Sequence, residues 1–542
     1  PEPPASTPTA APVLPTETPP LLAEHPGLTL PTDREELFSA SGACAVCHTG
    51  MVDETGADVS VDSAWRSTMM ANAARDPYWQ AAVRGEVASN PHLQAVIEDK
   101  CATCHMPMAH VSAVAEGGQG KVLDDGFLDP DESLHPLAID GVSCTLCHQI
   151  RKDGLGEADS YGGGYVIDTE LPAGAREAYG PYKVGKDLVQ IMQSASGFIA
   201  LEGPHTSASE LCATCHTLYT PYVDAAGEVA GVFPEQMAYF ELQASSFSNM
   251  TCQGCHMPAA DGGVQLSVTG GPPRSPFSQH QVVGGNVYVL EVLKRFGPEM
   301  SVTASSAQFQ DTQERVLEQL QKRTASIALD DAVLAGSTLM ADVRVATMVG
   351  HKYPTGFPSR RAWIHLVVED AAGETIFESG YANPDGSIEG NDNDSDPTAF
   401  EPHYLAIDAQ DQVQIYEPII GDTEGVVTTV LLRGGGYLKD NRLLPAGFDK
   451  DSVHEDIAVH GVAMEDEDFA GGGDLIQYAI DVGDASGPFM VTAELLYQAI
   501  GFRWADNMGR YDGPEPARFV GYYEQVSNQP VVVASATTEV GE

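Results

Sequence analysis

The sequence predicts a multidomain fold in which a mainly α-helical and irregular module is followed by an all-β, sandwich-like domain. Three observations support this prediction. All ten cysteines lie before residue 256, in repeats of one short pattern. Residues 306–325 carry apolar side chains at helical spacing. After residue 330, β-branched and aromatic runs alternate with turn-forming residues. The predicted divisions are a stalk or linker at 1–35, a module at 36–304, a connecting helix at 305–330 and a β-domain at 331–542.

The first predicted segment, 1–35, is rich in proline and threonine. Such a composition favours an extended polyproline-like spacer over a packed element. An unstructured chain end is the alternative interpretation.

The cysteine pattern is C-x-x-C-H, which is the attachment signature of c-type haem. It occurs five times and uses every cysteine. The cysteines are Cys44, Cys47, Cys101, Cys104, Cys144, Cys147, Cys212, Cys215, Cys252 and Cys255, and the histidines that follow are His48, His105, His148, His216 and His256. In this interpretation the thiols form thioethers and each histidine is the proximal iron ligand. A dithiol pair or a zinc site would explain one or two copies, but not five that all end in histidine.

The sequence therefore predicts five haems c as cofactors of the first module. Five such groups within residues 44–256 leave too little chain for a conventional apolar core, so we expect the porphyrins to form the core, wrapped by short helices and loops. Helix starts are predicted at Asp76, at Asn90 and at Ser207 or Ser209, where a capping residue precedes a helical pattern.

A second axial ligand decides whether a haem iron carries electrons or binds a substrate. Of the sixteen histidines, eleven lie outside the motifs. The candidate distal ligands in the first module are His92, His110, His135, His205 and His280. Met69 and Met70 are weaker candidates, because a methionine in such a segment more often packs in a core.

Several segments resemble the multihaem c-type cytochromes related to hydroxylamine oxidoreductase and pentahaem nitrite reductase. They are "CHMP" at 104–107, "GPHTSASELCATCH" at 203–216 and "SQHQVVGGN" at 278–286. "VGHKYPTGFPSRRAW" at 349–363 resembles the G-H-x-x-P-T-G segment of β-domains that follow haem modules in such proteins. The nitrite reductases of this group carry one C-x-x-C-K motif, whereas all five motifs here end in histidine.

The resemblance implies that His351 reaches a haem from the β-domain, as a ligand or as a propionate partner. Arg360 and Arg361 would then pair with propionates. A structural histidine at the edge of the sandwich is the alternative. Separately, Asp392, Asp394 and Asp396 alternate along the chain and could bind Ca²⁺, although a solvated acidic loop would look the same.

The formal charge is −49, so binding to nucleic acid is excluded. No apolar run is long enough to span a membrane. Because haem c is attached outside the cytoplasm, and the chain starts at proline, we expect a processed protein in the periplasm or at the cell surface.

The favoured function is an electron-transfer protein without an open haem site, whose partners are redox proteins or terminal electron acceptors. Two alternatives remain at this level. One is a multihaem reductase or oxidase of a small nitrogen or sulfur compound. The other is self-association into an oligomer or an extracellular cytochrome filament.

Overall fold

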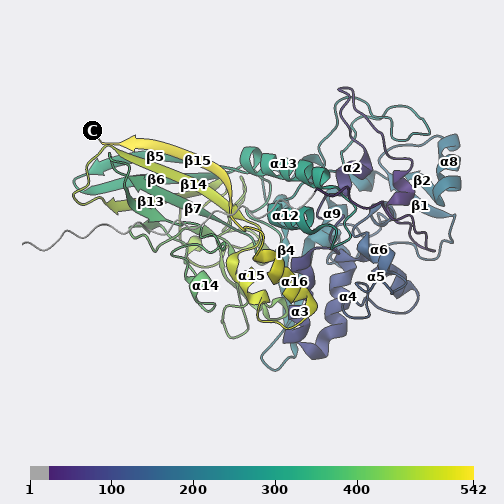
Figure 1. Ribbon diagram of the computed structural model, residues 1–542, viewed down its shortest axis with the longest axis horizontal. Helices are drawn as coiled ribbons and strands as arrows, with labels where there is room; N and C mark the ends of the chain where they lie inside the picture. Colours follow the sequence, from purple (N-terminus) through teal and green to yellow (C-terminus); the bar gives the residue numbers. More distant parts are fainter. Residues whose placement is uncertain (1–23, 542) are drawn as a thin grey trace, which may run out of the picture.

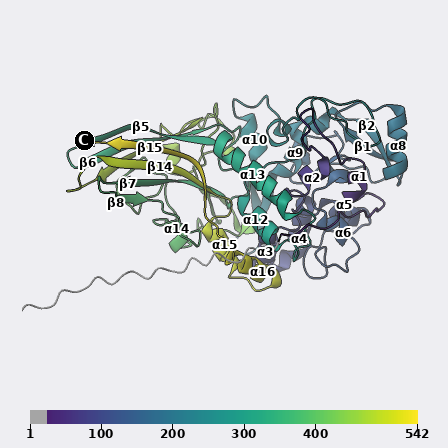
Figure 2. The ribbon, with the colours of Figure 1, turned by 45° about the horizontal axis from the view of Figure 1, so that its top comes forward.

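The computed structural model describes residues 24–541. The chain forms helices together with several β-sheets. The elements that precede α12 lie at one end of the molecule, and the long strands from β5 onward lie at the other end (Figure 1, Figure 2). The predicted stalk at 1–35 falls largely outside the described residues.

The first half of the chain consists of short helices and two small sheets. Its α-helices are α1 Gly42–Ala45, α2 Val61–Trp65, α3 Pro77–Ser89, α4 Gln94–His105, α5 Pro107–Ala115, α6 His135–Ile139, α7 Cys144–Cys147, α8 Lys186–Ser196, α9 Ser209–His216, α10 Ala238–Gln243, α11 Cys252–His256, α12 Val287–Phe296 and α13 Ser306–Arg323. Short 3₁₀ turns are η1 Pro91–Leu93, η2 Ala158–Ser160 and η3 Pro204–Ser207. Strands β1 Arg176–Gly180 and β2 Phe198–Glu202 pair in parallel, and β3 Thr217–Val223 pairs antiparallel with β4 Val229–Met237.

The predicted helix starts are confirmed in part. Asp76 caps α3, because its side chain accepts hydrogen bonds from the backbone of Tyr78 at 2.9 Å and Trp79 at 3.3 Å. The segment after Asn90 begins as η1 and becomes α-helical only at α4. The predicted serine cap before α9 is wrong, since the N-cap there is Ala208. Ser209 instead accepts a 3.1 Å hydrogen bond from the Cys252 backbone.

The second half contains the long strands. They are β5 Ala325–Ala335, β6 Thr338–Thr347, β7 Arg361–Glu369, β8 Thr375–Ser379, β9 Ala406–Ile407, β10 Ile415–Tyr416, β11 Pro418–Gly421, β12 Gly436–Asp440, β13 Gly473–Asp481, β14 Phe489–Gln498 and β15 Val531–Val540. One sheet has the order β5-β6-β13-β9. A second has the order β10-β7-β14-β15, with β8 added to β7, and β11 pairs with β12. The alternating burial along β6 and β13 reflects one apolar face per strand.

The prediction of an all-β domain at 331–542 needs correction. This part also contains α14 Asp392–Ser395, α15 Phe502–Met508 and α16 Pro514–Tyr523, with turns η4 Leu431–Arg433, η5 Glu455–Ile457 and η6 Val462–Met464. Helix α16 packs against α3, where the rings of Tyr78 and Phe519 lie 5.2 Å apart. Helices α15 and α16 both pack against α3 of the first half, a long-range contact that local strand patterns do not reveal.

The segment boundaries also differ from the prediction. Strand β5 begins at Ala325, so the predicted boundary between 330 and 331 falls inside a strand. Of the predicted stalk, residues 24–35 run along the rest of the chain: the Leu28 amide donates to Val302 at 3.0 Å and Leu30 is buried, while most of the other side chains are exposed. The predicted connecting helix matches α13, which buries Phe309, Val316 and Leu320.

The largest apolar core joins the two halves. Val343, Ile476, Leu366 and Val491 come from both long sheets and belong to one buried cluster that also includes Leu293 of α12. Two sheets that share one apolar interior form a sandwich. The described residues contain no helix that is long and apolar enough to cross a membrane.

Candidate metal centres

The five C-x-x-C-H motifs are called motifs 1 to 5, for residues 44–48, 101–105, 144–148, 212–216 and 252–256. Each contains or ends a short helix: α1, α4, α7, α9 and α11. On a helix, residues three apart lie on the same face. In motifs 2 to 5, both cysteines lie on the helix and therefore on one face of it, and the histidine follows directly; in motif 1, α1 ends before Cys47, which lies in the turn that follows. This is the local geometry that two thioethers and an adjacent iron ligand require.

The cysteines of different motifs meet in pairs. All ten thiols are free. The thiol of Cys44 lies close enough to that of Cys144 for the two to shift each other's pKa, and the same holds for Cys104 with Cys215 and for Cys212 with Cys252. Motif 1 is thus adjacent to motif 3, and motif 4 is adjacent to motifs 2 and 5.

Backbone and side-chain contacts support the same adjacency. The Ser41 backbone donates to Asp140 at 2.8 Å, which holds motif 1 beside motif 3. The Gln253 amide donates to the Ala208 carbonyl at 2.8 Å, which holds motif 5 against α9.

Tyr165 links motif 2 to motifs 3 and 4. Its hydroxyl donates to the Thr103 carbonyl at 3.0 Å. Burial, together with the nearby thiols of Cys215, Cys104 and Cys147, raises the pKa of this tyrosine well above its usual value. Sequence reasoning missed Tyr165, and its only local signal is an aromatic residue in the glycine-rich stretch 161–165.

A zinc site built from these cysteines does not fit the structure. Tetrahedral zinc needs three or four ligand atoms gathered around one point. Within residues 24–541, which include every cysteine, the one group of three or more His, Cys, Asp or Glu ligand atoms that converges in this way is His403, Asp466 and Asp474. The thiols of different motifs lie near one another in pairs, as those of neighbouring attachment sites would.

Four motif histidines share one orientation of the ring. Nδ1 donates to a backbone carbonyl in each: His48 to Leu266 at 2.7 Å, His105 to Ala73 at 3.1 Å, His148 to Tyr179 at 2.5 Å and His256 to Val283 at 2.5 Å. A carbonyl can only accept, so Nδ1 carries the proton. Burial lowers the pKa of His105 to about 4 and lowers that of His148, which keeps both rings neutral. Nε2 then presents a free lone pair, the state that an iron ligand needs.

Two motif histidines lie near a second histidine. The ring centroids of His148 and His280 are 6.4 Å apart, and those of His256 and His351 are 6.3 Å apart. Two imidazoles bound on opposite sides of one metal, each at about 2 Å with the nitrogen about 1.1 Å from the ring centre, place their centroids about 6 Å apart. His351 also donates from Nδ1, to the Lys352 carbonyl at 2.9 Å, which leaves its Nε2 free. The residues therefore fit two haem irons with histidine on both sides.

The other three motif histidines form no such pair among the described residues. Trp79 stacks on His105, with centroids 4.4 Å apart and an angle of 5° between the rings. Sequence reasoning missed this contact, whose signal is the tryptophan of "DPYWQ" at 76–80. Burial lowers the pKa of His216 to about 4, and Arg360 lies close enough to contribute to that shift.

The remaining candidate distal ligands differ in which ring nitrogen is hydrogen-bonded. His135 donates from Nδ1 to the Phe127 carbonyl at 2.9 Å, so its Nε2 is free. His205 uses Nε2 on the Ile150 carbonyl at 2.9 Å, and His110 uses Nε2 on Asp99 at 3.1 Å. His92 is exposed. Ligation by any of these four stays a prediction, and His135 has the most suitable orientation.

The methionine candidates lie near a motif but are not on a helix. Met69 and Met70 fall in the turns after α2. Met69 packs against the large apolar core, and the Met70 carbonyl accepts a 3.0 Å hydrogen bond from Val142. The structure gives both methionines packing and backbone roles, and thioether ligation stays a prediction.

Calcium binding by the three alternating aspartates stays a prediction. Asp392, Asp394 and Asp396 do not converge, and Asp394 is buried in an ion pair with Arg361 at 2.9 Å. This pair corrects the propionate role expected for Arg361, which is buried beside Asp394 and Gln498. A buried guanidinium needs a carboxylate partner, and Asp394 is that partner. Arg360 remains near His216 and His351.

The converging group His403, Asp466 and Asp474 was not anticipated from the sequence. Nδ1 of His403 accepts from Gln414 at 2.8 Å and from Asn441 at 3.1 Å. Both amides are oriented by backbone donors to their oxygens, from Tyr404 and Glu417. Nε2 of His403 must then carry the proton, which it donates to Asp466 at 2.9 Å. A protonated nitrogen cannot bind a metal, so this group is a hydrogen-bonded structural network.

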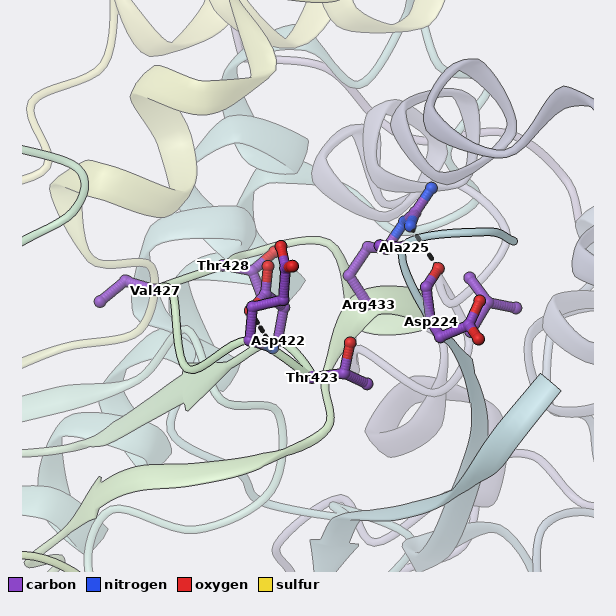
Figure 3. Close-up of a pocket in the computed structure, with 9 residues that line it drawn as sticks. Asp224, Ala225, Asp422, Thr423, Val427, Thr428 and Arg433 are labelled. Atoms are coloured by element: carbon purple, nitrogen blue, oxygen red, sulfur yellow. Dashed lines mark hydrogen bonds between the residues drawn. The ribbon is translucent and has the colours of Figure 1, made fainter. Parts of the chain in front are cut away.

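One surface pocket lies apart from the motifs (Figure 3). It has a volume of 320 Å³ and lies where the β3–β4 turn meets the loop after β11. Its lining residues are Val223, Asp224, Ala225, Asp422, Thr423, Glu424, Val427, Thr428 and Arg433. Arg433 donates to the Asp224 carbonyl at 2.7 Å across it. The lining contains no cysteine or histidine, and it takes no part in the candidate centres.

Comparisons with known proteins give little further evidence on the family or the function of the chain. No family model matches the sequence, and no curated protein matches it. A penta-heme cytochrome c552 from Thermochromatium tepidum is a structural neighbour, with 16% sequence identity and a TM-score of 0.48. The match covers 88% of this chain and 95% of that chain. Similarity at this level assigns neither a family nor a function, so the functional argument rests on the motifs and their geometry.

Proposed function

We propose that the chain is an extracytoplasmic electron-transfer protein that carries five covalently bound haems c, one on each motif. The observation that carries the proposal is the state of the motif histidines. Four of them hold Nδ1 on a backbone carbonyl and leave Nε2 free, and two of these lie near a second histidine ring, at 6.3–6.4 Å. The cysteines would hold the groups, and the bound haems would supply one-electron chemistry.

Electron transfer along the chain requires neighbouring centres. The thiol contacts place motif 1 beside motif 3 and motif 4 beside motifs 2 and 5, while Tyr165 lies among motifs 2, 3 and 4. Every motif therefore has at least one neighbouring motif, and motif 4 has the most. This arrangement supports a continuous path and favours a conduit over five independent sites.

Two histidines on one iron leave no position for a substrate. We therefore expect the haems of motifs 3 and 5 to be low-spin and to exclude small ligands. The strongly acidic chain, with a charge of −49, favours basic redox partners or cation-bridged contacts, and binding to a basic partner should weaken as salt rises.

The test is a redox titration of the purified haem-loaded protein, followed by optical and electron paramagnetic resonance spectra. Electron transfer predicts multiple reduction steps and low-spin haems, with no steady turnover of nitrite, hydroxylamine or sulfite. Turnover of one of these compounds at about 1–10³ s⁻¹, together with a high-spin haem that responds to it, would replace the conduit with a reductase.

A further inference from the structure

His351 does not belong to the part of the chain that carries the motifs. It lies in the loop between β6 and β7, 95 residues after His256. Its ring nevertheless lies 6.3 Å from that of His256, with an angle of 17° between them. Two rings that bind one metal must keep a fixed separation. The position of this loop beside motif 5 must therefore be fixed by contacts with the first half of the chain.

The loop makes a close approach to α10, the helix that precedes motif 5. A methyl group on Gly350 would lie 2.7 Å from the Leu242 side chain and 3.0 Å from Cβ of Phe247. These distances are shorter than normal contacts, so a Cβ here would require the Leu242 and Phe247 side chains to shift. The residue before His351 therefore rests directly on the first half of the chain.

Glu241 of α10 holds the loop on the other side of His351. Its Oε2 accepts from the Lys352 backbone amide at 3.1 Å and from the Thr355 hydroxyl at 2.6 Å. One carboxylate thus fixes the backbone directly after His351 and a side chain four residues later. The side chain of Glu241 is fully buried.

Two cations and a second carboxylate complete this anchor. Arg442 lies 3.0 Å from Glu241 Oε1 and 2.8 Å from Asp440, and Lys352 lies 2.7 Å from Asp440. The exposed fractions of the four side chains range from 0 to 7%. Two positive and two negative charges balance within the group, which makes their burial tolerable. We call Glu241, Lys352, Asp440 and Arg442 the clamp.

We propose that the clamp is a positioning device that holds His351 as the distal ligand of the haem on motif 5. This inference rests on the proposed function. Axial ligation of that haem is then a property of the contact between the two halves of the chain. The clamp residues do not touch the iron; they act through the backbone on both sides of His351. A buried ion network used in this way contributes specificity of position more than stability.

The experiment uses the full haem-loaded protein and carbon monoxide as the probe, since reduced haem binds it when the distal position is open. His351→Ala sets the reference and should add one carbon monoxide site per chain relative to wild type. Glu241→Gln should open the same haem, giving a gain of up to one site and a loss of up to one low-spin haem. Thr355→Val removes a single hydrogen bond to the carboxylate and should give a smaller gain.

The matched control is Glu417→Gln. Glu417 pairs with Lys439 at 3.2 Å, and both side chains are at least 92% buried, but among the described residues neither side chain forms a hydrogen bond or ion pair with the loop of His351. Its substitution should leave the carbon monoxide count unchanged.

Three results would overturn the inference. If His351→Ala adds no site, the ligand pair itself is wrong, and with it this part of the proposed function. If His351→Ala adds a site but Glu241→Gln and Thr355→Val do not, the pair stands and the clamp has no positioning role. If Glu417→Gln opens the haem as well, loss of any buried charge is sufficient and the clamp is not specific. Thr355→Val keeps the charge network intact, so it gives a result even where Glu241→Gln fails to fold.

Discussion

Histidines in the two halves of the chain are used in opposite ways. In the strand-rich half, His403 accepts at Nδ1 from Gln414 and Asn441 and donates at Nε2 to Asp466, so both ring nitrogens are satisfied. In the motif half, His148 and His256 spend Nδ1 on a carbonyl and keep Nε2 free. Polar groups in a protein interior normally have partners. His148 and His256 are only half-buried, so an unbonded Nε2, repeated at one motif position, is available to a ligand, whereas both ring nitrogens of the buried His403 serve a structural network.

The largest predicted effect concerns the motifs themselves. Intact mass of the purified protein after acidified acetone treatment should exceed the polypeptide by five haem masses, because thioethers survive extraction. Replacing both cysteines of motif 3, Cys144→Ala with Cys147→Ala, should reduce the excess to four. A wild-type excess below five would mean that a motif carries no haem.

The second prediction compares His280, a candidate haem ligand, with His403, whose two ring nitrogens are both hydrogen-bonded. His280→Ala should remove one low-spin haem per chain, because its ring lies 6.4 Å from His148. His403→Ala should leave the spectrum unchanged but lower the free energy of unfolding by about 1–3 kcal/mol, since it strands Asp466 and two amides. Electron paramagnetic resonance and chemical denaturation of both variants measure the two effects. A changed haem spectrum in His403→Ala, or an unchanged one in His280→Ala, would contradict the distinction between histidines that bind haem iron and histidines with both ring nitrogens hydrogen-bonded.

The third prediction concerns pH in the strand-rich half. Burial raises the pKa of Asp474 to about 7, despite hydrogen bonds from Tyr416 and Gln414. A carboxyl whose pKa is raised by folding holds its proton more tightly in the folded state. Its contribution to stability is complete below about pH 4 and is lost as pH rises through about 7. Asp474→Asn should therefore lose less stability than wild type between pH 4 and 8. The measurement is the melting temperature of each protein as a function of pH. If the two melting temperatures change in parallel between pH 4 and 8, this mechanism is absent.

The smallest effect is expected at the contact between α3 and α16. Arg84 lies 2.8 Å from Glu515 and 2.8 Å from Asp124. Glu515 is largely buried, and the Asp124 side chain is exposed. Arg84→Ala should lower the free energy of unfolding by about 1–2 kcal/mol, with haem spectra unchanged. Asp124→Ala is the control and should cost less, because exposed ion pairs contribute little.

The sequence predicted several features that depend on residues close together in the chain, such as helix caps and amphipathic helices. Asp76 was expected to cap a helix, and it does, because a cap depends on residues only two and three positions away. The helix at α13 was expected from the spacing of Phe309, Val316, Leu317 and Leu320, of which all but Leu317 are buried. Ser207 or Ser209 was expected to cap α9, but the N-cap is Ala208, and the Ser209 hydroxyl accepts a hydrogen bond from a distant segment, at Cys252. The helices α15 and α16 were missed for the same reason, since they form against α3.

The sequence by itself determined the repeated motif, its cysteines and its histidines, because attachment needs two thiols and a ring within five consecutive residues. Only the tertiary structure decided which distant residues meet them. It placed His280 near His148 and His351 near His256, brought motif 4 beside motifs 2 and 5, and paired Asp394 with Arg361. Contacts between residues far apart in the chain depend on how whole elements pack, and no pattern of neighbouring residues contains that information.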